Sequence, residues 1–482
     1  MTNFNPYQTD IKKHKTYATI GLCCQLILLL GALMYYKERM LFSDAPHVLF
    51  KIVNEHKLQI AEHRYGSFIT QAFPLIGSWL HLPLKALMVL YSAGFNLFFL
   101  SAGSLLAYHY KRYDLTILLS FYLTLFVSDT YFWTNNEIHQ GITWMFIAFA
   151  AGMHTAETKR ATLAAGIILI VLSALAIWTH PLVMLAMLFL WFFYVIDNRL
   201  KVFSNIEITA YSTILLGLSF VKFYQGMHHG YDSGKIEFVT QLNADGLKTI
   251  LSSPQLHSFV KHCITNYWLV LLLSVAGMIS LLKERKYLLA GYTIVAAGGY
   301  LLLICITYRE VKDWLFYMES EYMPLSIICC APFVYYTLPA LKKQFAVAGL
   351  VLIFGVRLAY IQHSSTIFND RVATLEQVIS KMKKHGITKA IVTQTDEAAN
   401  KQLIMNWGTP VESIVLSQLN GDVPQLSFIS ADSGMLKTFN TASKDTLLGC
   451  FEKVPANRIN SSYFVMDTAT VYTTVEYGEL MR

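Results

Sequence analysis

The stretch KKHKTYATIGLCCQLILLLGALMY, residues 12–35, places three lysines directly before an uncharged run at 17–35. A bilayer core is spanned by about 20 apolar residues in a helix, so this run is long enough to cross a membrane. It lacks the small-residue cleavage site of a signal peptide. We therefore expect it to remain in the chain as the first membrane span.

The same combination recurs along the chain, because clusters of Lys and Arg appear at every second turn between apolar stretches. The clusters are Lys12, Lys13 and Lys15; Lys111 and Arg112; Lys159 and Arg160; Arg199 and Lys201; Lys283, Arg285 and Lys286; and Lys342 and Lys343. Short cytoplasmic loops retain Lys and Arg. The alternation predicts a cytoplasmic N-terminus, although Lys37 and Arg39 after the first span run against the rule.

The composition predicts an α-helical polytopic membrane protein. Hydrophobic residues make up 54% of the chain and charged residues 14%, and the mean hydropathy is +0.42. Soluble proteins carry about 25% charged residues, and ionisable groups are costly in hydrocarbon. The hydropathy pattern predicts about eleven spans, at 17–35, 84–107, 115–133, 141–153, 161–178, 182–196, 208–223, 267–282, 287–306, 322–338 and 345–361. An odd number of spans places the C-terminus outside.

Charge and cysteine usage narrow the partners. From residue 362 to the end the chain has 11 Lys/Arg and 12 Asp/Glu, a net charge of −1. The whole chain has a net charge of +7, so residues 1–361 have a net charge of +8. Orientation and anionic lipid headgroups account for this basicity better than nucleic acid does. Of the seven cysteines, Cys263 and Cys450 are expected outside the membrane, and whether they pair stays open.

The chain divides into two predicted domains. Residues 1–361 form a membrane domain with outward loops at 36–83, 224–266 and 307–321. The first loop contains an amphipathic stretch, expected to lie on the membrane surface as a helix. Residues 362–482 hold no apolar run long enough to span. Instead, helix-like stretches at 374–385 and 397–407 alternate with β-like runs at 390–393, 413–416 and 426–429. This alternation predicts a small extracytoplasmic α/β domain.

Asp44 is the leading candidate for chemistry, in the run Phe-Ser-Asp-Ala-Pro at residues 42–46. This arrangement resembles the GT-C superfamily of lipid-linked-sugar glycosyltransferases. In that superfamily, the long first outward loop carries an acidic residue just after helix one. The resemblance implies that Asp44 is the base that activates an acceptor hydroxyl. The alternative is that Asp44 caps the surface helix, with Pro46 in its first turn.

Further polar residues stand in the other outward turns. Glu137 and His139 lie in Asn-Asn-Glu-Ile-His-Gln at residues 135–140, and His180 precedes Pro181 in a tight turn. The resemblance implies that Glu137, His139, His180 and Glu319 shape a sugar pocket. The alternative is a solvated loop with capping amides, and a turn histidine that is bonded to the backbone.

Three basic residues are candidates for a lipid phosphate: Arg64, Arg309 and Lys312. Arg makes bidentate contacts with phosphate and Lys supplies a point charge. The alternative is contact with lipid headgroups or snorkelling. Glu319 and Glu321 stand in Glu-Ser-Glu-Tyr-Met-Pro-Leu, which is similar to a Glu-Arg-Tyr-x-x-Pro run in several GT-C enzymes, with the arginine missing.

The resemblance implies an inverting glycosyltransferase of mannosyltransferase or arabinosyltransferase type. Its donor would be a polyprenyl-phosphate-linked sugar and its acceptor a glycan, lipid or protein. It would act on the outer face of a bacterial inner membrane, with the C-terminal domain in the periplasm and membrane lipids as neighbours. No metal ligands are predicted, but some GT-C relatives use a divalent cation, so a cation stays open.

Other functions remain as alternatives. One is a polysaccharide ligase or polymerase. Another is a non-enzymatic transporter or flippase, for which ionisable residues inside spans and broken helices are typical. A structural membrane protein is the third. The predicted spans are nearly free of charge, which favours an enzyme over a transporter.

Overall fold

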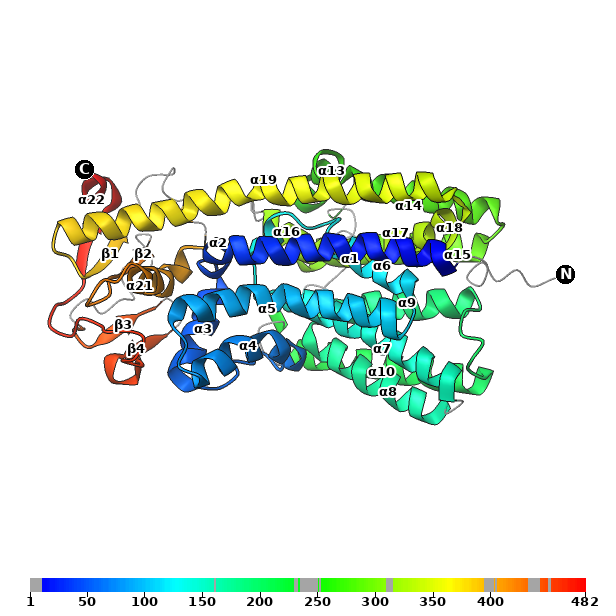
Figure 1. The fold of residues 1–482 in the computed structure, drawn as a ribbon, viewed down its shortest axis with the longest axis horizontal. Coiled ribbons are helices and arrows are strands. Elements are labelled where there is room, and N and C mark those ends of the chain that lie inside the picture. The colour runs from blue at the N-terminus through cyan, green and yellow to red at the C-terminus, as the bar shows by residue number, and fades with distance from the viewer. Residues whose placement is uncertain are drawn as a thin grey trace.

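The computed structural model describes residues 11–159, 162–228, 233–234, 250, 253–308, 315–393, 403, 405–431, 443–449 and 452–482. A bundle of long helices makes up most of the molecule, and a small α/β domain lies at one end (Figure 1). The first helix, α1, begins at the opposite end of the bundle.

The bundle is helical almost throughout. Its first half comprises α1 (Ile11–Met34), α2 (Tyr36–Met40), α3 (Asp44–Glu55), η1 (Tyr65–Ser67), α4 (Phe68–Trp79), α5 (Leu84–Ser104), η2 (Leu105–His109), α6 (Tyr113–Tyr122), η3 (Asp129–Phe132) and α7 (Glu137–Lys159). Its second half comprises α8 (Thr162–Thr179), α9 (Pro181–Ile196), α10 (Asn205–His228), α13 (Pro254–Thr265), α14 (Trp268–Lys283), α15 (Tyr287–Thr307), α16 (Leu315–Tyr322), α17 (Leu325–Pro332), η4 (Phe333–Thr337), α18 (Leu338–Ala340) and α19 (Lys343–Lys384).

The chain is a helical membrane protein, but the expectation of eleven spans is wrong. Among the described residues, five helices are long and apolar enough to cross a membrane: Lys13–Met34, Leu84–His109, Asn205–His228, Tyr287–Thr307 and Lys343–Lys384. The number rises to seven if each of two bent helix pairs is one span. The pairs are Pro254–Thr265 with Trp268–Lys283, bent by 85°, and Leu315–Tyr322 with Leu325–Ala340, bent by 54°.

The missing spans fail for physical reasons. The predicted span 115–133 breaks because α6 ends at Tyr122 and the chain then turns through the buried polar residues Ser128, Asp129 and Thr130. The apolar helices Leu163–Thr179 and Pro181–Ile196 are shorter than the roughly 20 residues that a bilayer core needs. Apolar composition alone therefore overcounted the spans, since buried helices of a bundle are as apolar as membrane spans.

The basic clusters gather at the end of the bundle far from the α/β domain. The Lys13 ammonium donates to the carbonyl of Pro339 at 2.7 Å, which ties the start of α1 to α18. The Asp197 carboxylate is 2.5 Å from Arg199 Nε and 2.9 Å from Lys286 Nζ, which ties the turn after α9 to the turn before α15. The sequence pattern predicted one shared side for these clusters. Which face of a membrane this side occupies stays a prediction.

The C-terminal domain is built on a parallel sheet in the order β2-β1-β5. Its strands are β1 (Lys389–Thr393), β2 (Ser427–Ala431) and β5 (Thr473–Glu476), and β3 (Thr446–Leu448) pairs antiparallel with β4 (Lys453–Pro455). The helical segments are η5 (Asn406–Gly408), α21 (Thr409–Leu419), η7 (Ala456–Arg458) and α22 (Tyr477–Met481). The β-like run at 413–416 lies in α21 instead, because Pro410 starts a helix whose faces are buried all round.

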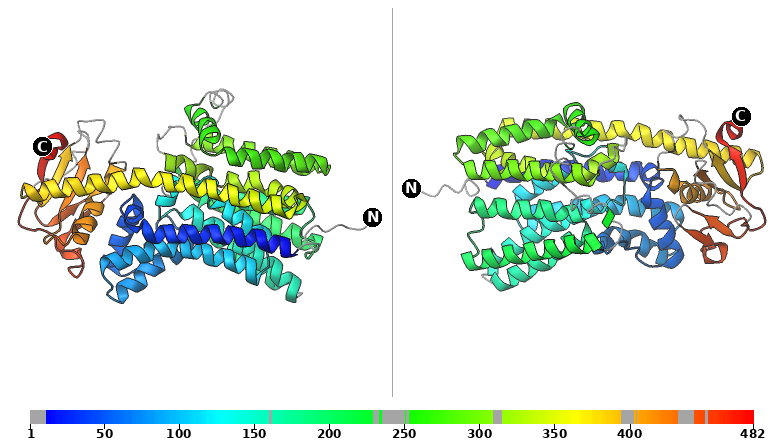
Figure 2. Two further views of the ribbon diagram at one scale, coloured as in Figure 1. Left: turned by 45° about the horizontal axis from the view of Figure 1, so that its top comes forward. Right: turned by 180° about the vertical axis from the view of Figure 1, so that it is seen from behind.

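Two features join this domain to the bundle. The helix α19 runs 42 residues without a break, so the expected domain boundary at 361 falls inside it. Figure 2 shows α19 extending from the helix bundle to the α/β domain. The amphipathic helix α3 packs its apolar residues Leu49 and Val53 into one core with Leu375 and Ile414 of the C-terminal part. The helix expected on the membrane surface is therefore covered by protein.

Candidate active site

Three of the predicted site residues come together where the bundle meets the C-terminal domain. Asp44 is the first residue of α3, Arg64 precedes η1, and Glu137 opens α7. Arg64 Nη1 lies 3.1 Å from Glu137 Oε2, and both side chains are mostly buried. The charges of Glu137 and Arg64 both act on the Asp44 carboxyl. The structure thus brings a carboxylate next to an ion pair from two distant segments.

The Asp44 carboxylate accepts hydrogen bonds, and no cation among the described residues lies within salt-bridge distance of it. Its Oδ2 accepts a hydrogen bond from Trp133 Nε1 at 3.1 Å and a long one from the Ser43 hydroxyl at 3.4 Å. Burial, and next the charge of Glu137, raises the pKa of Asp44 to about 6, while Trp133 and Arg64 oppose the rise. A carboxylate with such a pKa is a better proton acceptor than an ordinary aspartate.

Asp44 is not the N-cap of α3. Ser43 occupies that position, and no side chain caps the first turn of α3. Ser43 has φ +59° and ψ −126°, a conformation that is strained for a residue with a Cβ. The turn before Asp44 is therefore kept in its shape by its surroundings, which are described below.

Arg64 is placed by a turn that only glycine allows. A Cβ on Gly66 would lie 1.9 Å from Thr179 Oγ1 and 3.0 Å from a ring carbon of Trp144. The indole of Trp144 also donates to the Gly66 carbonyl at 3.0 Å. The loop that carries Arg64 is thus docked on α7 and α8, because its backbone can approach them closely.

Glu137 is placed by the asparagines before it. Tyr91 donates to Asn135 Oδ1 at 2.8 Å, and Asn136 Oδ1 accepts from the Ile138 amide at 3.0 Å. Capping amides were the alternative interpretation of this run, and Asn136 plays that part. Glu137 itself sits in the first turn of α7, where the helix dipole favours a negative charge.

The two predicted histidines lie elsewhere. His139 is 3% exposed and packs among the rings of Phe95, Phe99 and Tyr122. Two residues correspond to about 200° around a helix, so His139 faces the core where Glu137 faces the site. His180 is the N-cap of α9, and its Nδ1 accepts from the Leu182 amide at 3.2 Å. The alternative of a turn histidine bonded to the backbone describes this contact.

Glu319 and Glu321 are buried behind the site. Glu319 Oε2 accepts from the Thr130 amide at 2.6 Å and its hydroxyl at 2.8 Å. Gln255 Nε2 donates to Glu321 Oε2 at 3.0 Å. Their helix reaches the site through Phe316 and Tyr317, whose rings lie edge-on to Trp133 at 5.4 and 5.8 Å. In this structure Glu319 therefore supports the segment that carries Trp133, and Glu321 joins α16 to α13.

The predicted phosphate ligands Arg309 and Lys312 lie outside the described residues, as does Cys450. In the part of the chain that the structure describes, no three His, Cys, Asp or Glu side chains gather in a way that could hold a metal ion.

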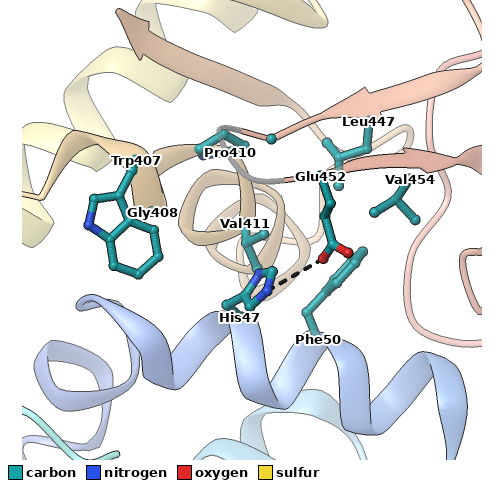
Figure 3. A pocket seen from close by; sticks show the side chains of 10 residues that line it. His47, Phe50, Trp407, Gly408, Pro410, Val411, Leu447, Glu452 and Val454 are labelled. Carbon is teal, nitrogen blue, oxygen red and sulfur yellow. Dashed lines mark ion pairs between the residues drawn. The ribbon is translucent and has the colours of Figure 1, made fainter. Parts of the chain in front are cut away.

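A narrow pocket lies one helical turn beyond Asp44, between α3 and the C-terminal domain. His47 and Phe50 point into it from α3, and Trp407 and Glu452 come from the domain (Figure 3). Glu452 lies 3.4 Å from His47 Nε2 and 3.3 Å from Lys51 Nζ. The cavity volume is about 20 Å³, which holds about one water molecule. The pocket therefore has no room for a ligand larger than a water molecule.

Trp133 and Ser43 are site residues whose roles sequence reasoning missed. Trp133 lies at the end of the predicted span 115–133, and its indole donates a hydrogen bond to the Asp44 carboxylate. Ser43 lies in the run at 42–46, but its positive φ could not be predicted from the sequence, because serine rarely adopts a positive φ.

Comparison with known proteins does not identify a family for this chain. No protein-family model matches the chain, and no curated protein matches it either. The resemblance to the GT-C superfamily therefore depends on the run at 42–46 and the layout around it.

Proposed function

We propose that this protein is a membrane glycosyltransferase that uses a polyprenyl-phosphate-linked sugar, with Asp44 as the base. The observation that carries the proposal is the half-buried Asp44 carboxylate beside the Arg64–Glu137 ion pair. A raised pKa in a carboxylate with a specific charged neighbour is typical of functional sites. A covering domain above it supplies a place for an acceptor.

The reaction follows from this arrangement. The acceptor hydroxyl gives its proton to the Asp44 carboxylate as its oxygen forms a bond to the anomeric carbon of the sugar. The bond from that carbon to the phosphate oxygen breaks, and the polyprenyl phosphate leaves with the electron pair. Attack opposite to the leaving group inverts the anomeric centre. A base with a pKa near the working pH suits this proton transfer.

Arg64 is the described cation nearest to this chemistry. Its guanidinium is paired with Glu137 on one side, so it is oriented before substrate arrives. In the proposal it attracts the leaving phosphate, because arginine forms charge-assisted bonds to phosphate oxygens. Arg309 and Lys312 stay as predicted further phosphate contacts.

The proposed location is the outer face of a bacterial inner membrane, with the C-terminal domain in the periplasm. The gathering of Lys and Arg at the opposite end of the bundle supports this orientation, since such residues favour the cytoplasm. Fluorescent or protease-accessible tags at each terminus of the protein in cells would test it.

The test of the activity uses purified protein in nanodiscs and undecaprenyl phosphate carrying radiolabelled mannose or arabinose. Release of sugar to water or to an added glycan is expected, and Asp44→Asn is expected to abolish it. Asp114→Asn, a buried carboxylate change at the basic end of the bundle, is the matched control. Donor consumption that is equal in Asp44→Asn and in wild type would refute the mechanism.

A transporter or flippase is the second candidate, and the structure contains features that favour it. The spans were expected to be nearly free of charge. Yet Arg357 lies fully buried in α19 and donates to the carbonyls of Thr124, Val127 and Asn266. Two candidate spans are also sharply bent. Buried ionisable residues and discontinuous helices are typical of transporters.

The two functions separate in one experiment. A proteoliposome assay follows the flipping of a fluorescent polyprenyl-phosphate analogue across the bilayer. A transporter predicts flipping that survives Asp44→Asn and is lost in Arg357→Gln. The glycosyltransferase predicts donor consumption that depends on Asp44, with no flipping above that of empty vesicles.

A further inference from the structure

The C-terminal domain reaches the turn that precedes Asp44 through a buried ion pair. Arg371 of α19 and Glu412 of α21 lie 2.7 Å apart, and their side chains are 1% and 0% exposed. They come from segments more than 320 residues after this turn in the chain. A fully buried pair between two C-terminal elements thus lies beside the first outward turn.

Each member of the pair contacts the turn. Arg371 Nη1 donates to the Leu41 carbonyl at 3.4 Å, and its guanidinium carbon lies 5.8 Å from the centre of the Phe42 ring. Burial raises the pKa of Glu412 to about 7, while Arg371 and the Ser43 backbone act on this carboxyl in the opposite direction. The ion pair therefore lies against the residues that come directly before Asp44.

The turn needs such a hold because of its backbone. Ser43 has a positive φ, and strained residues of this kind persist only where their surroundings over-determine them. The surroundings also leave no room for variation at Gly408, where a Cβ would lie 2.6 Å from Glu412 Oε1 and 3.6 Å from the Ser43 carbonyl. Glu412, Gly408 and Ser43 are fitted to each other.

We propose that the Arg371–Glu412 pair positions Asp44, by holding the strained turn at Ser43 so that the Asp44 carboxylate meets Trp133 and the acceptor. Stability alone does not explain the ion pair, because apolar residues of the same volume would hold the domain to the bundle about as well. Glu412 and Arg371 are positioning residues, and their effect on the reaction rests on the proposed function.

The chain offers a matched control. Lys383 lies on the same helix as Arg371 and pairs with Asp422 of the same domain at 2.6 Å, away from the turn. Glu412→Gln is expected to lower kcat for sugar release by about 30-fold with KM changed less than about twofold, because a misplaced base affects the transition state. Lys383→Met is expected to change neither by more than about twofold. Equal loss in both variants would overturn the positioning role.

A rescue variant separates positioning from general damage. Glycine adopts a positive φ without strain. Ser43→Gly is therefore expected to keep the conformation of the turn when the carboxylate of Glu412 is absent. The double variant with Ser43→Gly and Glu412→Gln is expected to recover about threefold or more of kcat over Glu412→Gln. No recovery, with the melting temperature of wild type retained, would contradict the proposal.

A second readout does not depend on catalysis. Fluorine NMR of protein labelled with fluorotryptophan reports Trp133, whose resonance is assigned by its loss in Trp133→Phe. In wild type this resonance follows the protonation of Asp44. In Glu412→Gln the midpoint is expected to fall toward that of a solvated aspartate, while Lys383→Met leaves it unchanged. An unchanged midpoint in Glu412→Gln would overturn the inference.

This readout also distinguishes the two proposals. Wild-type protein that consumes no donor while the Trp133 titration shifts in Glu412→Gln would reject the proposed function and keep the positioning role. If Glu412→Gln does not fold, the double variant Arg371→Met with Glu412→Leu replaces the pair by apolar residues. It is expected to fold, with the same shift in the Trp133 titration, and a folded variant without the shift would refute the proposal.

Discussion

The two ends of the helix bundle treat their carboxylates differently. At the basic end, Asp114 lies 2.8 Å from the Arg112 guanidinium and also accepts from the Tyr335 hydroxyl. Asp197, at the same end, forms ion pairs with both Arg199 and Lys286. At the other end, Asp44 has an indole N–H and a distant serine hydroxyl, with the carboxylate of Glu137 nearby. A protein that only needed stability would compensate both ends alike, so the poorly compensated carboxylate marks the end where chemistry is expected.

The largest expected effect breaks this contrast directly. Asp44→Asn is expected to lower kcat by about 10³-fold, because it removes the base. Its thermal stability should equal or exceed that of wild type, since a poorly compensated charge is lost. Asp114→Asn is expected to do the reverse, with activity kept within a few-fold and unfolding free energy lowered by about 3 kcal/mol. Sugar release and detergent melting curves measure both, and a large activity loss in both variants would erase the distinction between the ends.

The pH dependence has the next largest effect. With the pKa of Asp44 raised to about 6, kcat should fall about tenfold for each pH unit below that value. The stability change has the opposite sign. The folded protein binds the Asp44 proton more tightly than the unfolded chain, so the contribution of this group to stability is lost as pH rises through the window from the ordinary aspartate value to 6. Asp44→Asn should remove this slope from melting curves, and a slope that survives would contradict the assignment.

The neighbours of Asp44 should move the pH profile in opposite directions. Glu137 raises the pKa of Asp44 and Arg64 lowers it. Glu137→Gln is therefore expected to shift the acidic limb of the kcat profile to lower pH, and Arg64→Gln to higher pH, each by up to about one unit. Arg64→Gln should also raise KM for the donor if it contacts the phosphate. Shifts in the same direction would show that the two side chains do not act on Asp44 by charge.

The smallest effect is expected from the indole. Trp133→Phe keeps the ring against Phe316 and Tyr317 but removes the donor to Asp44. Loss of one hydrogen bond to a charged group corresponds to about 1.5 kcal/mol, or about tenfold in kcat at most. The acidic limb should move to higher pH, because the hydrogen bond stabilises the charged form. An unchanged profile would show that the indole does not share the Asp44 proton equilibrium.

The sequence was informative where signals are local. The acidic residue after the first span, the polar run at 135–140 and Arg64 were identified from position and residue type, and the structure brings Asp44, Arg64 and Glu137 together. His139 shows the limit, since a residue two positions from Glu137 faces the other side of the same helix. Residue type alone does not separate the two faces until the helix boundaries are known.

Long-range features could not be predicted in this way. The ion pair of Arg371 with Glu412 joins two helices through a contact with no periodic signature, and Arg371 also donates to the Leu41 carbonyl more than 320 residues away. The number of spans was overestimated because apolar helices buried in protein and apolar helices in lipid have the same composition. Three-dimensional contacts, rather than hydropathy, distinguish them.

The unbroken helix α19 has a mechanical consequence. At 1.5 Å per residue its 42 residues form a rod about 63 Å long, anchored among the spans by Arg357 and joined to the Ser43 turn by Arg371. A tilt of about 5° at the anchored end displaces the far end by about 5 Å. Such a lever converts a small rearrangement between spans into a large displacement of the domain that covers the carboxylate. Crosslinking α19 to its neighbours would therefore lock the cover without touching the site.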